Sequence, residues 1–175
     1  MTIYALSTGT GISGVAVIRV SGKNTAEVVK KLTGSKLPVP RVATLKKFNK
    51  NGGKELIDEG VIIWFPAPNS YTGEDLAEFH VHGSHAVIKA MHLAISKVKN
   101  CRLAEPGEFT KRAFQNGRIN LLKAESIGDL ISAETEIQRK QALKIMSGRS
   151  SEKFNSWREK LLEILSHIEA KIDFP

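Results

Sequence analysis

The chain has 175 residues, of which 41% are hydrophobic and 25% are charged. This composition is ordinary for a globular protein, no stretch is apolar enough to cross a bilayer, and the length excludes more than two modules. The formal net charge of +8 suits a polyanionic partner such as RNA, but the lysines are scattered along the sequence, so a solvated surface explains them equally well. The single cysteine, Cys101, and an N-terminus that does not resemble a secretory signal favour a cytoplasmic location.

The first part of the chain predicts a strand followed by a helix. Residues 14–20, "GVAVIRV", are rich in β-branched residues, and residues 23–34, "KNTAEVVKKLTG", show helical spacing of aliphatic residues before Gly34 ends the helix. Residues 9–14, "GTGISG", match the dinucleotide-binding pattern G-x-G-x-x-G, but the third glycine opens a strand and not a helix. We therefore expect a glycine-rich loop with close backbone approach, and no dinucleotide site.

Residues 38–66 predict a β-hairpin followed by a loop. Two β-like runs flank "NKNGGK", in which residues 51–53 suit a tight turn. The second run, "GVIIWF" at 60–65, is apolar at every position, which predicts a central strand covered on both faces. The prolines and polar residues of 66–73 then predict a loop.

A second strand and helix follow this loop. Residues 75–83, "DLAEFHVHG", alternate with period two, so one face of the predicted strand carries Leu76, Glu78, His80 and His82. Residues 84–98 switch to helical spacing with a stripe of aliphatic residues and methionine, which is typical of a core-facing helix.

The sequence after this helix predicts a short extended piece from Cys101 and then a further helix. That helix should be entered at Pro106, with Glu108 near the positive end of its dipole and Gly117 as its terminator.

The composition changes near residue 118. Two long amphipathic helices are predicted over 120–146 and 154–174, with no strand after the change. We therefore divide the chain into domains 1–118 and 119–175. The apolar stripe of the last helix has too little in this chain to pack against, so we expect oligomerisation or an incomplete helical domain.

Glu78, His80 and His82 invite comparison with a metal site. Side chains at i and i+2 on a strand point to one side, as ligands of one metal can. However, the carboxylate that follows H-x-H in cupin-like sites is replaced here by His85 and Ala86, and a helix follows in place of more strands. We therefore expect no metal site, and packed or hydrogen-bonded histidines.

The residue pattern offers no nucleophile with a base and no phosphate-binding G-x-x-x-x-G-K-[ST] segment. What remains is Glu78, a carboxylate on a face suited to burial, with Arg19 and Arg118 elsewhere in the first domain. Such a carboxylate needs hydrogen-bond donors. These donors are either an arginine of the protein or the amino-pyrimidinone edge of a ligand such as a pterin or guanine.

Four segments resemble the MnmE (TrmE) family of tRNA-modification GTPases, in order and over nearly the whole chain. They are "GVAVIRVSG" (14–22), "FPAPNSYTGEDLAEFHVHG" (65–83), "RLAEPGEFTKRAFQNGRINLLKAESIGDLISAET" (102–135) and "AKIDFP" (170–175). The resemblance implies an α+β N-terminal domain, with a mixed sheet and short helices similar to folate-binding aminomethyltransferase domains. It implies a helical domain next, into which family members insert a Ras-like GTPase domain.

The resemblance also implies a function that composition cannot show. Family members form homodimers through the N-terminal domain and act with a flavoprotein, MnmG (GidA), on carbon 5 of the wobble uridine of tRNA. The added group is aminomethyl or carboxymethylaminomethyl, and its one-carbon unit is thought to come from a tetrahydrofolate derivative, such as 5-formyl- or 5,10-methylenetetrahydrofolate.

Matched by motif, the folate contacts fall on Arg19, Glu78 and Arg118. The resemblance places GTP, Mg²⁺ and K⁺ in the GTPase domain, so we expect no catalytic residue, no metal site and no GTP hydrolysis in these 175 residues. A basic RNA-binding module without cofactor remains the alternative.

Overall fold

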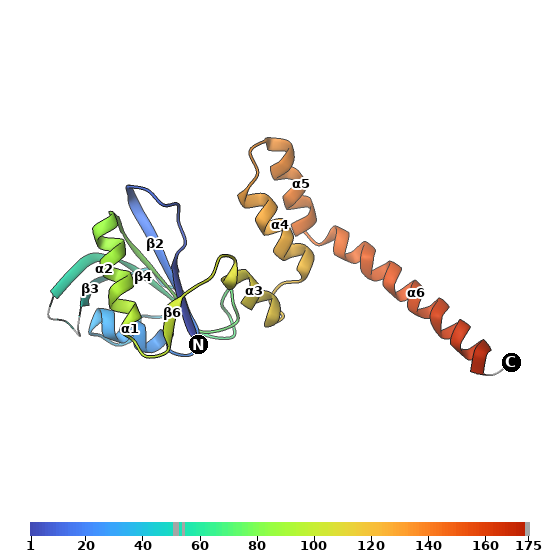
Figure 1. Ribbon diagram of the computed structural model, residues 1–175, viewed down its shortest axis with the longest axis horizontal. Helices are drawn as coiled ribbons and strands as arrows, with labels where there is room; N and C mark the ends of the chain where they lie inside the picture. Colours follow the sequence, from blue (N-terminus) through green and yellow to red (C-terminus); the bar gives the residue numbers. More distant parts are fainter. Residues whose placement is uncertain (51–52, 54, 174–175) are drawn as a thin grey trace. The chain divides into compact units, whose positions relative to one another are not determined.

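The computed structural model describes residues 1–50, 53 and 55–173, in two compact units, Met1–Arg118 and Ile119–Pro175. The first unit is a sheet with short helices, and the second consists of helices (Figure 1). The predicted class, a mixed sheet with short helices followed by longer helices, is confirmed.

The sheet of the first unit has six strands within the described residues, in the order β3-β4-β5-β2-β1-β6. Strands β1 and β6 pair in parallel, and the other neighbours pair antiparallel. The strands are β1 (Thr2–Leu6), β2 (Ser13–Ser21), β3 (Thr44–Lys50), β4 (Glu55–Phe65), β5 (Leu76–Gly83) and β6 (Cys101–Leu103).

Strand β1 was not predicted, although it lies inside the sheet. It pairs with β2 on one side and with β6 on the other, and Thr2 lies opposite Cys101. A strand of five residues carries little local signal, and one of its two partners, β6, lies far away in the sequence.

The glycine-rich segment before β2 differs in one respect from its prediction. Gly14 lies in β2, as the strand prediction requires. The expected close backbone approach is wrong, because no neighbouring atom lies within 4 Å of a Cβ built at Gly9, Gly11 or Gly14.

Helices α1 (Thr25–Thr33) and α2 (His85–Ser96) pack against one face of the sheet. Gly34 ends α1 in the left-handed conformation, with φ of 62°. Ser84 caps α2 by accepting a hydrogen bond from the amide of Val87. The core between this helical layer and the sheet includes Ile18, Val20, Val28, Val29, Phe48, Phe79, Met91 and Ile95.

The alternation predicted for β5 is confirmed, because Ala77, Phe79 and Val81 are buried in this core. The prediction that β4 is covered on both faces is wrong. Ile62 is buried under the helices, whereas Ile63 points to the opposite face and is half-buried. The hairpin of β3 and β4 is confirmed by its antiparallel pairing. The predicted turn falls on residues 51–53, of which 51 and 52 lie outside the described residues.

Helix α3 (Glu108–Gln115) completes the first unit. It begins two residues after Pro106, with Gly107 as its N-cap, and Gly117 follows its end with φ of 66°.

The second unit contains α4 (Leu121–Ile131), α5 (Glu136–Met146) and α6 (Arg149–Asp173). The single helix predicted over 120–146 is wrong. Ser132 ends α4, and Thr135 starts α5 through a capping box with Gln138. Such a box supplies the first amides of a new helix with acceptors, so the chain turns and α4 packs on α5.

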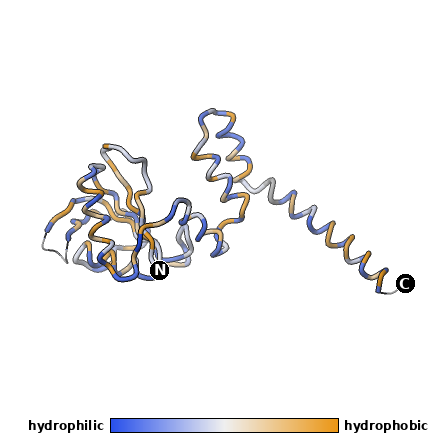
Figure 2. Tube along the Cα trace, viewed as in Figure 1, coloured by the Kyte–Doolittle hydropathy of each residue, from blue (hydrophilic) through white to orange (hydrophobic). Residues whose placement is uncertain are grey.

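Helix α6 begins five residues earlier than predicted and carries apolar residues along its length (Figure 2). Its Trp157, Leu161, Leu165 and Ile168 side chains are exposed. None of the helices in the described part of the chain is long and apolar enough to cross a membrane.

Candidate ligand-binding site

The sheet face opposite α1 and α2 holds a pair of opposite charges. Arg19 on β2 and Glu78 on β5 lie directly across from each other in the strand register. Both Nε and Nη2 of Arg19 contact one carboxylate oxygen, Oε1 of Glu78, at 2.9 and 2.8 Å. Of the two kinds of donor that the sequence left open for Glu78, the arginine is therefore present. The second oxygen, Oε2, accepts no hydrogen bond from the described residues.

His80 lies beside this free carboxylate oxygen. It follows Glu78 by two residues on β5, so both side chains lie on the same face. Its Nε2 is 3.8 Å from Glu78 Oε2, which is too long for a hydrogen bond. This nitrogen is buried and has no hydrogen-bond partner among the described residues. A free acceptor and an unpartnered ring nitrogen thus lie side by side, so the protein itself leaves two polar atoms unsatisfied at this point.

Two aromatic rings flank the guanidinium of Arg19. The rings of Tyr71 and Phe109 each have their centroid 5.6 Å from the guanidinium carbon. The Tyr71 hydroxyl is 2.9 Å from the hydroxyl of Thr110 on α3. Rings at this position hold the arginine by cation–π contact and offer apolar area next to the charged pair.

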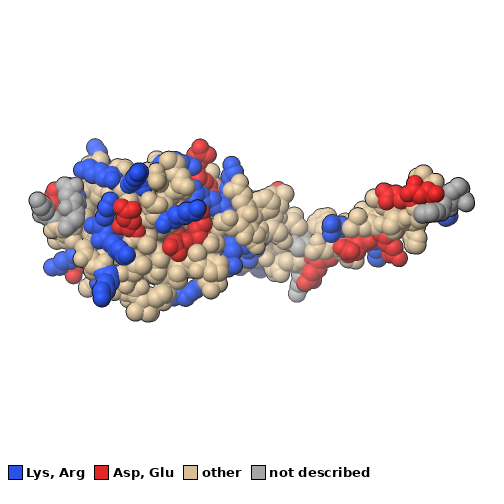
Figure 3. All heavy atoms as spheres, turned by 90° about the horizontal axis from the view of Figure 1, so that it is seen from below, with Lys and Arg blue, Asp and Glu red and all other residues tan. Residues whose placement is uncertain are grey.

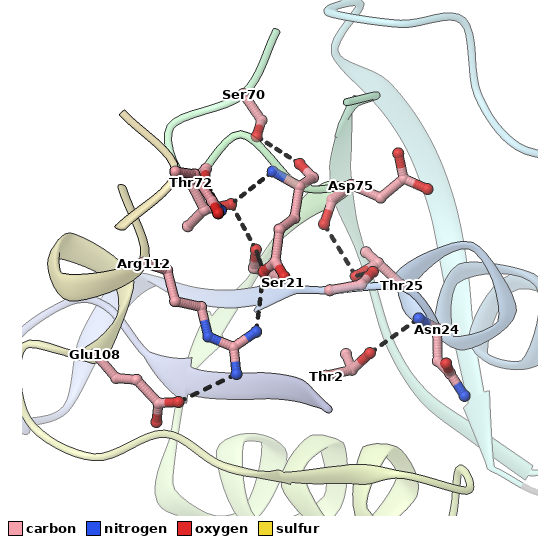
Figure 4. A network of polar contacts seen from close by, with 12 residues as sticks. Thr2, Ser21, Asn24, Thr25, Ser70, Thr72, Asp75, Glu108 and Arg112 are labelled. Atoms are coloured by element: carbon pink, nitrogen blue, oxygen red, sulfur yellow. Dashed lines mark hydrogen bonds and ion pairs between the residues drawn. The ribbon is translucent and has the colours of Figure 1, made fainter. Parts of the chain in front are cut away.

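Polar contacts fix the loop that carries Tyr71. The hydroxyl of Thr72 is 2.7 Å from that of Ser21 on β2, and both residues are fully buried (Figure 4). Arg112 of α3 donates to Glu74 at 2.9 Å. Asn116 donates to the carbonyl of Thr72 at 2.7 Å. The loop is thus tied to both β2 and α3, which holds Tyr71 and Phe109 in place beside the Arg19–Glu78 pair.

Glu108 anchors this arrangement at the first position of α3. It accepts two hydrogen bonds from Arg102, at 2.7 and 2.8 Å, one from Arg112 at 3.1 Å and one from the amide of Glu105 at 2.9 Å. Burial by itself raises the pKa of Glu108, but these hydrogen bonds outweigh it and lower the pKa to about 2. The carboxylate is therefore ionised at neutral pH, as its place at a helix N-terminus favours.

Arg118, the third predicted folate contact, lies against the same loop. A Cβ built at Gly73 would stand 3.2 Å from Cγ and 3.3 Å from Cδ of Arg118. The backbone amide of Arg118 donates to the carbonyl of Ala113, closing the end of α3. Its side chain is exposed, and its guanidinium forms no ion pair with the described residues. The structure therefore brings Arg19 and Glu78 into contact and places Arg118, just after α3, against the loop that carries Tyr71.

His82, the remaining member of the predicted face, belongs to a different contact. Its Nδ1 is 2.8 Å from Asp58 Oδ1 on β4, and its backbone amide donates to Oδ2 of the same carboxylate. Burial tends to raise the pKa of Asp58, but hydrogen bonds from His82 and from the amide of Glu59 lower it overall. No group of three His, Cys, Asp or Glu side chains within the described residues is spaced to hold a metal ion.

Tyr71 and Phe109 were not singled out from the sequence. Both belong to motifs that carry the family resemblance, "PNSYTGED" and "PGEFTKRAF". Their separation of 38 residues hides the fact that they flank one guanidinium, which only the packing of α3 against the loop brings about.

Comparison with known proteins places the whole chain in one family. Residues 2–118 match the family model described as "GTP-binding protein TrmE N-terminus", and residues 121–175 match "MnmE helical domain". The chain is 74% identical over 175 residues to a tRNA modification GTPase MnmE of Pelagibacter ubique, covering all of this chain and 40% of the relative.

Other relatives are similar over the same length. The chain is 51% identical over 175 residues to the tRNA modification GTPase MnmE of Phenylobacterium zucineum, covering 99% of this chain and 38% of the relative. It is 50% identical over 173 residues to the mitochondrial 5-taurinomethyluridine-[tRNA] synthase subunit GTPB3 of Danio rerio, covering 99% of this chain and 34% of the relative. The chain thus spans well under half the length of these curated relatives. By its match to both family models, the chain belongs to the MnmE (TrmE) family of tRNA modification GTPases.

Proposed function

We propose that these residues form the tetrahydrofolate-binding, dimerising part of a tRNA modification GTPase. In this proposal the whole protein acts in the cytoplasm with a flavoprotein partner, MnmG (GidA), on carbon 5 of the wobble uridine. The group it adds is aminomethyl or carboxymethylaminomethyl. GTP, Mg²⁺ and K⁺ serve the GTPase domain of the whole protein and not the residues described above.

The name of one relative supports the proposal that a uridine of tRNA is modified at carbon 5 with a one-carbon unit. The Danio rerio relative is named as a subunit of a 5-taurinomethyluridine tRNA synthase. A taurinomethyl group joins an amine to carbon 5 through one methylene carbon, as a carboxymethylaminomethyl group also does. A tetrahydrofolate derivative carries such a carbon, so a folate site in the same family supplies what the product needs.

The observation that carries the proposal is the free Oε2 of Glu78 beside the unpartnered Nε2 of His80. A pterin presents a ring N–H and an exocyclic amine, and the free Oε2 of Glu78 can accept a hydrogen bond from one of them. The rings of Tyr71 and Phe109 supply apolar area nearby. Arg118 offers an exposed guanidinium for the carboxylates of the folate tail or for a carbonyl of the ligand.

Calorimetric titration of the chain with 5-formyltetrahydrofolate tests this proposal. We expect Glu78→Ala to abolish binding while the circular dichroism spectrum stays native. Glu59→Ala is the matched control, because Glu59 is an exposed carboxylate on the neighbouring strand β4. We expect this variant to bind 5-formyltetrahydrofolate with the affinity of the parent chain. Tight binding of 5-formyltetrahydrofolate by the Glu78→Ala variant would contradict the assignment of Glu78 as a folate contact.

The proposed dimer has a candidate surface at the turn between β1 and β2 and the first residues of β2. Ile12 is 88% exposed and Val15 is 57% exposed, so two apolar side chains meet solvent there. We expect sedimentation velocity to show a dimer that Ile12→Ser and Val15→Ser together weaken. An unchanged dimer in this double variant would remove this surface from the proposal.

The alternative, a basic RNA-binding module without cofactor, predicts salt-dependent tRNA binding and no response to folate. The titration above separates the two, because only the folate site predicts heat on adding 5-formyltetrahydrofolate.

A further inference from the structure

Basic residues are unevenly distributed in the first unit. Residues 22–50 and 85–104 together hold twelve of the chain's 26 Lys and Arg residues but one of its 18 Asp and Glu residues, Glu27. These two segments include α1, β3 and α2. Nearly half of the basic residues therefore lie in a few neighbouring elements that hold a single acidic residue.

The fold brings lysines from these elements to one surface. A hollow of about 370 Å³ is lined by Lys31 of α1, Lys50 of β3 and Lys97 next to α2, with no acidic residue in its wall. A second hollow shares Lys31, adds Lys30 and Lys36, and includes one acidic residue, Glu27. We call Lys30, Lys31, Lys36, Lys50 and Lys97 the lysine surface. Figure 3 shows many Lys and Arg side chains on one side of the first unit, with some Asp and Glu among them.

Most of the charge on the lysine surface is not neutralised by the protein. Lys31 pairs with Glu27 at 2.8 Å, and Lys50 pairs with Glu55. Lys30, Lys36 and Lys97 are exposed, and none forms an ion pair with a described residue. Like charges held together on a rigid helical layer leave a positive potential that favours a polyanion.

We propose that the lysine surface binds the phosphate backbone of RNA without reading its sequence. The choice of RNA rests on the proposed function, since the named relatives act on tRNA. The lining of both hollows contains no aromatic residue on which a base could stack, so the contacts suit phosphates and not bases.

This surface lies apart from the Arg19–Glu78 pair. Helices α1 and α2 pack on the face of the sheet that buries Phe79, whereas Glu78 points to the opposite face. A phosphate backbone bound by the lysine surface therefore does not reach the candidate folate site of the same unit through that contact. The lysine surface holds the RNA, and the modified base is bound elsewhere.

The test measures binding of an unmodified tRNA transcript to the 175-residue chain, by fluorescence anisotropy over a series of KCl concentrations. The test variant carries Lys30→Gln, Lys36→Gln and Lys97→Gln. The control variant carries Lys123→Gln, Lys144→Gln and Lys160→Gln, which removes the same charge from exposed helical positions of the second unit. If each lysine of the surface contacts a phosphate, the slope of log K against log[KCl] falls by about two to three in the test variant. The control variant should keep the parent slope.

Several results would overturn the proposal. If both variants lose the same amount of tRNA affinity, the net charge of the chain, and not the lysine surface, determines binding. Absence of tRNA binding by the parent chain overturns the proposal, as does binding only to vesicles of phosphatidylglycerol, which would assign the surface to a membrane.

Folate titration of the same variants keeps the two proposals apart. Loss of tRNA binding with intact folate binding supports the lysine surface, and a parent that binds tRNA but not folate contradicts the proposed function alone.

Discussion

Arg19 and Glu78 lie opposite each other on β2 and β5, and two nitrogens of the guanidinium contact the same carboxylate oxygen. This one-sided geometry leaves Oε2 of Glu78 available, whereas a fork that used both oxygens would have satisfied the carboxylate. The pair is therefore a cross-strand contact within the sheet, and one oxygen of its carboxylate is still able to accept a hydrogen bond from a ligand.

The Arg19–Glu78 pair should contribute little to stability. Its side chains are 27% and 19% exposed, so a double-mutant cycle of Arg19→Met and Glu78→Gln should give a coupling energy of about 0.5–1 kcal/mol. Urea unfolding of the four proteins measures this value. The more exposed pair of Glu27 and Lys31 on α1 is the control and should couple more weakly. A coupling energy of several kcal/mol would show that the pair stabilises the fold, and would contradict a role for it in ligand binding.

His80 should matter for folate binding and not for stability. His80→Leu removes a buried nitrogen without a partner, so the free energy of unfolding should stay the same or rise. If Nε2 bonds the ligand, the affinity for 5-formyltetrahydrofolate should fall about tenfold, the equivalent of one hydrogen bond. His82→Leu, whose ring instead contacts Asp58, should leave this affinity unchanged. Equal effects of the two variants would contradict the assignment of His80.

Glu108 should make the stability of the first unit depend on acidic pH. Its pKa in the folded chain is about 2, below the ordinary value of 4.5, so the ionised form is favoured by folding. This stabilisation, on the order of 2 kcal/mol, is complete above the unfolded value and is lost as the pH falls towards 2. Urea unfolding from pH 7 to pH 3 should show Glu108→Gln destabilised at pH 7 and approaching the parent at pH 3. Glu105→Gln, at an exposed neighbouring position, should follow the parent throughout.

Gly60 should be required on β4 next to the candidate site. A Cβ there would lie 2.1 Å from the backbone carbonyl oxygen of His80, which cannot move without distorting β5. Gly60→Ala should therefore lower the free energy of unfolding by about 1–3 kcal/mol. Gly11→Ala is the control, because nothing lies within 4 Å of a Cβ at that position. Thermal unfolding measures the stability of both variants. Equal stabilities would contradict the explanation that a clash with the His80 carbonyl requires glycine at position 60.

Much of the local structure could be predicted because its signals lie within a few residues of each other. The alternation of 75–83 predicted a strand with Glu78, His80 and His82 on one face, and Gly34 marked the end of α1. The break between α4 and α5 also had a local signal, Thr135 followed by Gln138, which was outweighed by the long amphipathic pattern around it.

The sequence by itself determined the class of the fold, the family, and the types of residue at the candidate site: a carboxylate on a strand and two arginines. Only the tertiary structure decided which arginine meets Glu78, because strand register depends on partners 59 residues apart. It also decided that Tyr71 and Phe109 flank that arginine, and that lysines from α1, β3 and α2 form one surface. Such contacts join residues far apart in the chain, and packing of the core, not local propensity, determines them.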